Sequence, residues 1–398
     1  MKSRNWRSGF VRACAAISLF ACSLNAQKPP AKVPLLVVLD GTEAEQWRAW
    51  SAERGWRVLA APPVAEKSID LRILALQGSV AATLKDSGID SERVYLAGRG
   101  DFAALAFYVA ARVPDLWTAV AVIGGSPQPA IDSERFFGIN FSHLPLLWVG
   151  APGDEKVAAK LKDAGVSLEY RAAAGATPAN VLDWLASHHR DRFPDEIDCE
   201  TTSPQFSSCY WVQMTKFDAS ARNDVLPTTR LQPSSRATLD LGGFSYAPED
   251  KGPGALVNGL AEKYNGPLKL NDRIVAVAGK PLQDGTELTK LLEAATEDKP
   301  VVVTVQRGKE RIRLETRILV PQRQEVISAR VQAKYLPEEK QIEVISRTAS
   351  ELRVTVPEAW VGATLNWNGT AVAKVDSPGC WQLVLDKQLL QSATRCPQ

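Results

Sequence analysis

The sequence predicts a multidomain protein: a doubly wound α/β domain, then an α+β domain, then a small all-β region. Strand-like and helix-like patterns alternate between residues 33 and 194, which indicates a parallel sheet with right-handed crossovers. Residues 237–321 combine several strand patterns with one helix, and β-branched residues alternate from residue 322 onward. A chain of 398 residues has room for roughly two to four domains.

Residues 1–26 have the composition of an export signal peptide. Basic residues precede the apolar run 13–21, which is too short to span a bilayer as a helix, and a small residue precedes the predicted cleavage site. Residues 19–22 also resemble a lipoprotein box, which would place a lipid anchor on Cys22, although the bulky Phe20 fits that pattern poorly. No later stretch is apolar enough for a membrane span, so we expect a periplasmic or extracellular protein.

Four cysteines remain after the signal: Cys199, Cys209, Cys380 and Cys396. An even number in an oxidising compartment predicts disulfides, with three possible connectivities. We favour the local pairs, Cys199 with Cys209 and Cys380 with Cys396, because they close short loops. No C-x-x-C spacing exists, and His188–His189 has no partner at ligand spacing, so we predict neither a metal nor a cofactor.

The predicted α/β domain covers residues 27–194. Its first strand, residues 33–39, is wholly apolar, as expected for a strand buried on both faces of a parallel sheet. Further strands are predicted at 57–60, 94–99, 119–123, 146–150 and 167–171, and helices at 43–54, 70–84, 102–112, 155–164 and 179–188.

The bend at residues 94–106 carries the most informative pattern. An apolar strand enters a Gly-x-X-x turn and continues as an Ala-rich helix. This stretch resembles the α/β-hydrolase superfamily, and most of all its polyhydroxybutyrate-depolymerase-like esterases, whose bend reads Gly-x-Ser-x-Gly and exposes the nucleophilic serine. Gly98 keeps the first glycine, Gly100 stands at the serine position and Phe102 replaces the second glycine.

The other catalytic positions of that family are also altered. The resemblance places the acid after a strand-ending glycine, where Gly150 and Asp154 match with one extra residue between them. It places the histidine in the loop 171–178, which contains none. The three histidines of the chain are His143, His188 and His189. Serine chemistry needs both a nucleophile and a base, so the resemblance predicts a pseudo-hydrolase rather than an enzyme.

An alternative is an active hydrolase with a nonstandard nucleophile. Asp101 adjoins the bend, and Ser79 and Ser126 lie in its neighbourhood. The structural interpretation of the same residues is a carboxylate at a helix start, a hydroxyl on a helix surface and a hydroxyl in a loop.

Residues 195–236 are predicted to be a linker with one or two strands that pair with the C-terminal region. The segment contains Cys199 and Cys209, a strand-like run at 209–214 and a stretch rich in Pro, Ser and Thr.

Residues 237–321 resemble a PDZ domain over its full length. Residues 241–244 correspond to the carboxylate-binding loop, and residues 254–257 and 266–279 to the strand and the L-x-x-G-D-x-I-x-x-I-x-G run that follow. Asn271 replaces a glycine of that run, a change that turn-tolerant asparagine can absorb. Residues 284–295 would be the groove helix, and residues 301–306 and 311–319 a closing hairpin.

The resemblance implies capture of peptide or protein C-termini by strand addition, with the carboxylate on backbone N–H groups of the glycine loop. The implied peptide-binding residues are Leu241, Gly242, Gly243, Phe244, Tyr246, Leu288, Leu291 and Leu292. The three helix leucines are equally explained by packing of the helix on its sheet. Gly242 stands at an apolar position of the family, which reduces the apolar lining of the pocket.

Residues 322–398 predict a β-rich C-terminal domain. Asn368–Gly369 is a strong hairpin turn signal. Trp360, Trp367 and Trp381 are expected to fill a small core, with a ligand-stacking surface as the alternative.

These patterns predict a secreted or periplasmic, non-catalytic binding protein. The alternatives are an esterase- or peptidase-type hydrolase with a nonstandard nucleophile, and an envelope assembly protein whose C-terminal sheets pack on a partner. The net charge of +2 gives no reason to expect nucleic acid as a partner.

Overall fold

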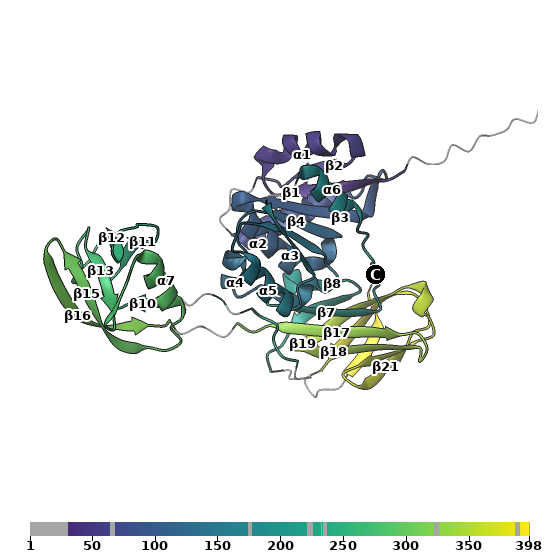
Figure 1. The fold of residues 1–398 in the computed structure, drawn as a ribbon. Helices are drawn as coiled ribbons and strands as arrows, with labels where there is room; N and C mark the ends of the chain where they lie inside the picture. The colour runs from purple at the N-terminus through teal and green to yellow at the C-terminus, as the bar shows by residue number, and fades with distance from the viewer. Residues whose placement is uncertain are drawn as a thin grey trace, which may run out of the picture.

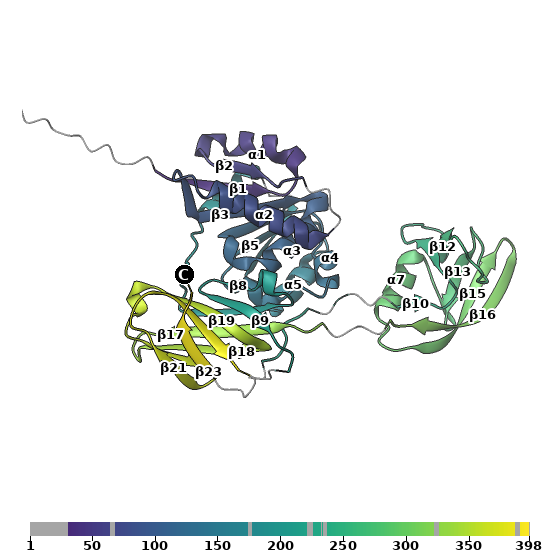
Figure 2. The ribbon, with the colours of Figure 1, turned by 180° about the vertical axis from the view of Figure 1, so that it is seen from behind.

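The computed structural model describes most of the chain. The described residues are 31–63, 68–173, 177–220, 226–231, 233, 237–321, 326–386 and 391–397. The predicted signal peptide and Cys22 lie outside them. Across these ranges, no helix is both long and apolar enough to cross a membrane. The chain folds into an α/β body above a β-sandwich, with a smaller α+β body set apart from both in two opposite views (Figure 1, Figure 2).

The α/β body is built on a six-stranded parallel sheet in the order β2-β1-β3-β4-β5-β6. Its strands are β1 Val33–Val38, β2 Arg57–Ala60, β3 Ile89–Arg99, β4 Ala119–Ile123, β5 Leu146–Gly150 and β6 Leu168–Ala172. Its helices are α1 Ala44–Ser51, α2 Ile69–Thr83, α3 Ala103–Arg112, α4 Gln128–Asp132, α5 Glu155–Asp163 and α6 Pro178–Ala186.

Alternate residues of each strand pack against helices on opposite faces of this sheet. Leu35 and Val37 of β1 belong to one core with residues of α2, α3, α4 and α5. Leu36 and Val38 belong to a second core, to which α1 contributes Trp47 and α6 contributes three residues. Helices therefore cover both faces, which confirms the predicted doubly wound architecture.

The β-sandwich is assembled from two distant parts of the chain. One sheet has the order β21-β20-β18-β17-β7 and the other β23-β22-β19-β9-β8. The first part supplies β7 Glu196–Thr201, β8 Ser208–Cys209 and β9 Val212–Phe217. The second supplies β17 Ala329–Leu336, β18 Gln341–Arg347, β19 Ala349–Val356, β20 Thr364–Trp367, β21 Thr370–Lys374, β22 Gly379–Leu385 and β23 Gln391–Arg395.

Pairing of β7 with β17 and of β9 with β19 joins the two parts. We therefore propose that they form one domain, into which residues 237–321 are inserted. Its core contains Trp360, Trp367 and Trp381, which are 4%, 0% and 6% exposed. So little exposed ring surface excludes the stacking of a ligand on these tryptophans and confirms their role in the core.

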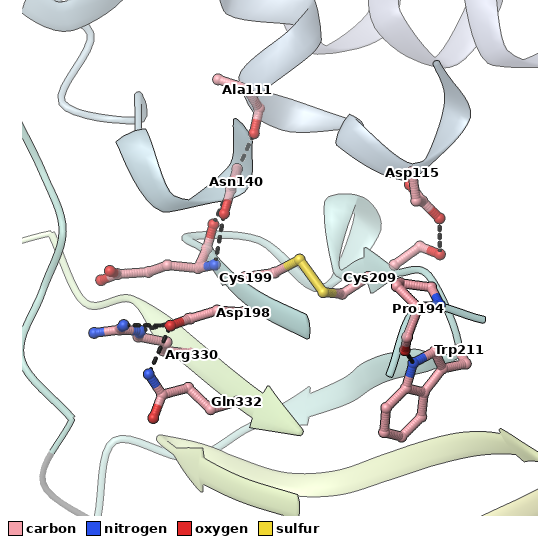
Figure 3. The surroundings of a disulfide bond; sticks show 12 residues. Ala111, Asp115, Asn140, Pro194, Asp198, Cys199, Cys209, Trp211, Arg330 and Gln332 are labelled. Carbon is pink, nitrogen blue, oxygen red and sulfur yellow. Dashed lines mark hydrogen bonds and ion pairs between the residues drawn. A yellow bond between two sulfur atoms is a disulfide. The ribbon is translucent and has the colours of Figure 1, made fainter. Parts of the chain in front are cut away.

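Two disulfides stabilise the sandwich, and both are the local pairs that the sequence favours. Cys199 of β7 is bonded to Cys209 of β8, so the bond links the two sheets (Figure 3). Cys380 of β22 is bonded to Cys396, which follows β23. The predicted Asn368–Gly369 turn is also present between β20 and β21, with φ of +46° and +78°.

The inserted body has the sheet order β10-β16-β15-β13-β12-β11, and β14 pairs with β13. Its elements are β10 Thr238–Leu239, β11 Phe244–Ala247, β12 Ala255–Leu260, β13 Arg273–Val277, β14 Lys280–Pro281, α7 Gly285–Glu293, β15 Lys299–Arg307 and β16 Glu310–Leu319. Strand β11 lies at the edge of the sheet, so one of its sides has no strand partner in the part of the chain that the structure describes.

The α/β body contacts the sandwich through buried polar groups. Asn140 donates to the carbonyl oxygens of Ala111 (2.7 Å) and Glu200 (2.9 Å) and accepts from the Glu200 N–H (2.8 Å), as Figure 3 shows in part. The buried guanidinium of Arg112 lies 4.6 Å from the ring centre of Phe206, and burial lowers its pKa. The Thr202 hydroxyl accepts from it at 3.2 Å.

The carboxylate of Glu200 is fully buried and binds both segments that lead to the inserted body. It accepts from the Thr228 hydroxyl (2.8 Å), from the Thr229 N–H (2.8 Å) and hydroxyl (2.9 Å), and from the Ser328 hydroxyl. Arg347 of β18 neutralises its charge at 3.0 Å. A buried carboxylate is tolerated only with such partners, so this cluster fixes where the two segments leave the sandwich.

We predict that Glu200→Ala lowers the free energy of unfolding of the sandwich by about 3–5 kcal/mol, because it leaves Arg347 without a buried counter-ion. Urea unfolding followed by tryptophan fluorescence measures this loss. The matched control is Glu196→Ala on the same strand, where the partner Lys334 is exposed; its effect should stay within about 0.5 kcal/mol. Equal losses in the two variants would contradict the prediction.

Candidate functional site

The carboxyl edge of the parallel sheet has an open crevice. The chain leaves β1 toward one face and β3 toward the other, which makes this the point where strand order reverses and where ligands of such folds bind. A cavity of about 420 Å³ is lined by residues after β1 and β2 together with Phe102 and Leu105. A second cavity of about 510 Å³ shares Arg72, Phe102 and Leu105 with it and is also lined by Asp101.

The bend beside this crevice depends on glycine at two positions. A Cβ on Gly98 would lie 2.6 Å from the Ala106 Cβ and 2.8 Å from the Phe102 carbonyl oxygen, so strand and helix touch there. Gly100 has φ of +56°, which disfavours other residues. A Cβ on Gly100 would meet no atom within 4 Å. A side chain at that position would therefore point into open space.

The candidate replacement nucleophiles belong to three different parts of the fold. Asp101 is exposed at the mouth of the larger cavity. The Ser126 hydroxyl accepts from the Gln128 N–H at 3.1 Å and stabilises a local turn. Ser79 lies in the last two turns of α2. The carboxylate of Asp154 accepts from the Ala151 N–H at 2.8 Å, an interaction within its own turn.

The three histidines lie toward the opposite edge of the sheet. His143 precedes β5, and its ring contacts Tyr210 at a centroid distance of 5.5 Å. His188 and His189 follow α6, and the next residue, Arg190, donates its N–H to Glu92 near the start of β3. The loop 171–178 is described except for residues 174–176.

A second candidate site is the glycine loop between β10 and β11. Gly242 has φ of +80°, and a Cβ there would lie 2.7 Å from the ring of Tyr264. The Tyr264 hydroxyl donates to the Leu241 carbonyl (2.6 Å) and accepts from the Leu268 N–H (2.9 Å). These two bonds hold the start of the glycine loop against Tyr264. Among the described residues, no acceptor is bonded to the N–H of Gly242 or Gly243. Two such amides can bind an anion.

A cavity of about 560 Å³ adjoins this loop and the edge strand β11. Its lining residues are Ala237, Thr238, Leu239, Asp240, Gly242, Gly243, Phe244, Tyr246, Leu292 and Leu319. Five of the eight peptide-binding residues proposed from the sequence are therefore brought together here.

The other three leucines do not line that cavity. Leu241 and Leu288 are 3% and 0% exposed and belong to the domain core, against which Leu291 packs. Packing of the helix on its sheet, the alternative stated above, therefore accounts for Leu288 and Leu291. Leu239 and Leu319 were not foreseen as lining residues, because they meet only through the long-range pairing of β10 with β16.

The turn into β13 is stabilised by a buried ion pair. Asn271 has φ of +69°, in agreement with its place at a glycine position. Arg307 donates to both carboxylate oxygens of Asp272, at 2.9 and 2.7 Å, and the Lys269 N–H donates at 2.7 Å. Burial favours a raised pKa for Asp272, but the bonds from Arg307 and Lys269 outweigh it, so this pKa lies below its ordinary value.

Comparison with known protein families identifies this part of the chain. Residues 248–318 match the family model described as "PDZ domain". This segment is a PDZ domain. Strand β11, helix α7 and the glycine loop are thus the elements that border its peptide groove.

Several solved structures, esterases among them, are similar to part of the chain. A thermostable esterase shares 19% identity over 41% of this chain and 56% of its own length, with a TM-score of 0.31. SOBER1 of Arabidopsis thaliana shares 16% identity over 39% of this chain and 97% of its own, with a TM-score of 0.29. The carboxylesterase of Bacillus cereus shares 12% identity over 39% of this chain and 88% of its own, with a TM-score of 0.29. No curated protein matches the chain.

We predict that the PDZ domain of the variant Arg307→Gln unfolds at a higher pH than that of the natural protein when the solution is acidified. The pKa of Asp272 is lower in the folded state than its value of about 3.9 in the unfolded chain. The ion pair therefore stabilises the fold fully above the unfolded-state pKa, and this stabilisation is lost as the pH falls through the folded-state pKa. Removing Arg307 raises the folded-state pKa of Asp272, so the pH at which acid unfolds half of the PDZ domain should rise by roughly half a pH unit. We call this pH the midpoint.

Pepsin cleavage of the PDZ segment between pH 2.5 and 4.5 reports this midpoint. The control is Arg311→Gln on the neighbouring strand β16. The exposed guanidinium of Arg311 donates to the uncharged side chain of Gln306, so this variant should leave the midpoint nearly unchanged. An unshifted midpoint in Arg307→Gln would show that the buried pair does not limit acid stability.

Proposed function

We propose that this chain is a binding protein whose PDZ domain captures the C-terminal ends of peptides or proteins by strand addition to β11. The observation that carries the proposal is the coincidence of three features at one place: the unpaired edge of β11, the two amides of Gly242 and Gly243 without a bonded acceptor among the described residues, and the open cavity beside them. An added strand would bond to β11 while its terminal carboxylate meets the glycine loop.

The α/β domain serves in this proposal as a scaffold without hydrolase chemistry. Gly100 has no side chain to act as a nucleophile, and the histidines lie toward the amino edge of the sheet. A serine-type mechanism needs a base within hydrogen-bond reach of the nucleophile. The location of the protein outside the cytoplasm is part of the same proposal, supported by the export signal in the sequence and by two disulfides.

A second candidate is a hydrolase with a nonstandard nucleophile. It is favoured by one observation: the cavities beside the bend are open, and Asp101 lines one of them. A carboxylate can form covalent intermediates when a neighbouring group activates it. The two candidates differ in whether the protein turns over an ester.

Binding of a fluorescein-labelled hexapeptide that ends in Ala-Phe tests the proposed function. We predict binding of the free acid and at least tenfold weaker binding of the C-terminal amide, because only the carboxylate satisfies the glycine loop. Asp240 lines the same cavity and repels the ligand carboxylate, so Asp240→Asn should tighten binding by about two- to fivefold at low salt.

The gain from Asp240→Asn should vanish at high salt and with the amidated peptide, since both remove the repulsion that the substitution relieves. Equal affinities for acid and amide would refute capture of C-termini.

Labelling with a fluorophosphonate and turnover of short-chain esters test the second candidate. We predict that the natural protein shows neither. The double variant Gly100→Ser, Ala174→His should accept the label at position 100, because a side chain there enters open space, whereas Ala174 lies outside the described residues. Labelling of the natural protein at a single site would identify a nucleophile and contradict the non-catalytic proposal.

A further inference from the structure

The groove between β11 and α7 differs at its two ends. At the glycine loop it opens into the cavity of about 560 Å³, where Phe244 and Leu292 line the space between strand and helix. Phe244 and Tyr246 point to the same side of β11, with ring centres 6.2 Å apart, and Ser245 points to the other side, where its hydroxyl donates to Asn258. The groove can thus be followed along β11 from Phe244 toward Ala247.

At the far end the helix touches the strand directly. A Cβ on Gly285, the first residue of α7, would lie 2.5 Å from the Ala247 carbonyl oxygen and 2.8 Å from the Pro248 Cα. The Thr286 hydroxyl donates to the Pro248 carbonyl at 3.0 Å. Only the absence of a side chain at Gly285 allows this approach.

A hydrogen bond crosses the groove one helical turn further along α7. The hydroxyls of Tyr246 and Thr289 are 2.9 Å apart and half-buried. The bond joins the edge strand to the helix at the third residue of β11, between the open cavity and the contact at Gly285. We name this pair the hydroxyl bridge.

This geometry limits how much of a ligand can be added as a strand. A new strand lies about 4.8 Å from its neighbour and needs that space along its whole length. No such space exists where α7 contacts Ala247 and Pro248, and the hydroxyl bridge occupies the groove beside Tyr246. Only Phe244 and Ser245 remain accessible for pairing, which corresponds to about two ligand residues.

We propose, resting on the proposed function above, that this PDZ domain recognises only the last two residues of a chain, because the groove is closed beyond Ser245. The terminal side chain would occupy the cavity lined by Leu239, Phe244, Leu292 and Leu319. The volume of about 560 Å³ is large enough for an aromatic ring. Ligand residues further from the C-terminus lie outside the groove.

Competition by unlabelled, N-acetylated peptides against the labelled hexapeptide tests this inference on the full chain. Peptides of two, four and six residues share the C-terminal pair Ala-Phe. The expected dissociation constants agree within about threefold across the three lengths. A tenfold or greater gain from two to six residues would overturn the inference while leaving C-terminal capture intact.

The same assay with the last residue changed tests the cavity. Hexapeptides ending in Phe or Leu should bind at least tenfold more tightly than those ending in Gly or Asp. Equal affinities would show that the terminal side chain does not occupy this cavity and would overturn the placement of the ligand on which the inference depends. Absence of binding by every peptide, including the free-acid hexapeptide, would refute the proposed function and this inference with it.

Two variants test whether the hydroxyl bridge or the contact at Gly285 closes the groove. Tyr246→Phe and Thr289→Val each remove one hydroxyl of the bridge and keep the shape of the side chain, and we expect both to gain at least threefold for six residues over two. Ser245→Ala on the other side of β11 is the matched control and should behave as the natural protein. Length independence in the variants would also support the inference and assign the closure to the Gly285 contact.

Discussion

A single buried glutamate connects the sandwich with the α/β body and with the two segments that lead toward the PDZ domain. Glu200 accepts hydrogen bonds from residues just before the PDZ domain, Thr228 and Thr229, and from Ser328 just after it. Its charge is balanced by Arg347 of the sandwich, and its backbone bonds to Asn140 of the α/β body. Because leaving a buried carboxylate unpaired is costly, these groups favour one mutual arrangement. The two segments that lead toward the PDZ domain are therefore anchored to the sandwich at Thr228, Thr229 and Ser328.

Local patterns in the sequence predict the parts whose physical cause is local. The apolar run in β1 reflects burial on both faces of the sheet, and Asn368–Gly369 forms its turn because both residues tolerate positive φ. The disulfides follow from short spacings in the chain. The PDZ groove was recognisable for the same reason, since Gly242, Gly243 and Phe244 are consecutive.

Features that depend on contacts between segments far apart in the sequence cannot be predicted in full from local patterns. The predicted pairing of residues 195–236 with the C-terminal region is found in the structure. The sequence did not specify β17 and β19 as the partners or their register, since register is decided by burial in the assembled sandwich. Leu288 has the spacing of a groove residue and is instead fully buried, because α7 packs that side against the sheet. The closed end of the groove depends on Gly285, whose contact with Ala247 joins residues far apart in the chain.

The pairing of Thr238 with Leu319 determines how the PDZ domain is joined to the rest of the chain. It brings the two ends of the PDZ domain side by side, so the domain occupies the position of a loop between β9 and β17. Insertions at such surface positions are tolerated when their ends meet, because closing the parent loop then costs little chain entropy. We therefore expect that the PDZ domain can be replaced by a short turn, or exchanged for another domain, while both sheets of the sandwich keep their strand order.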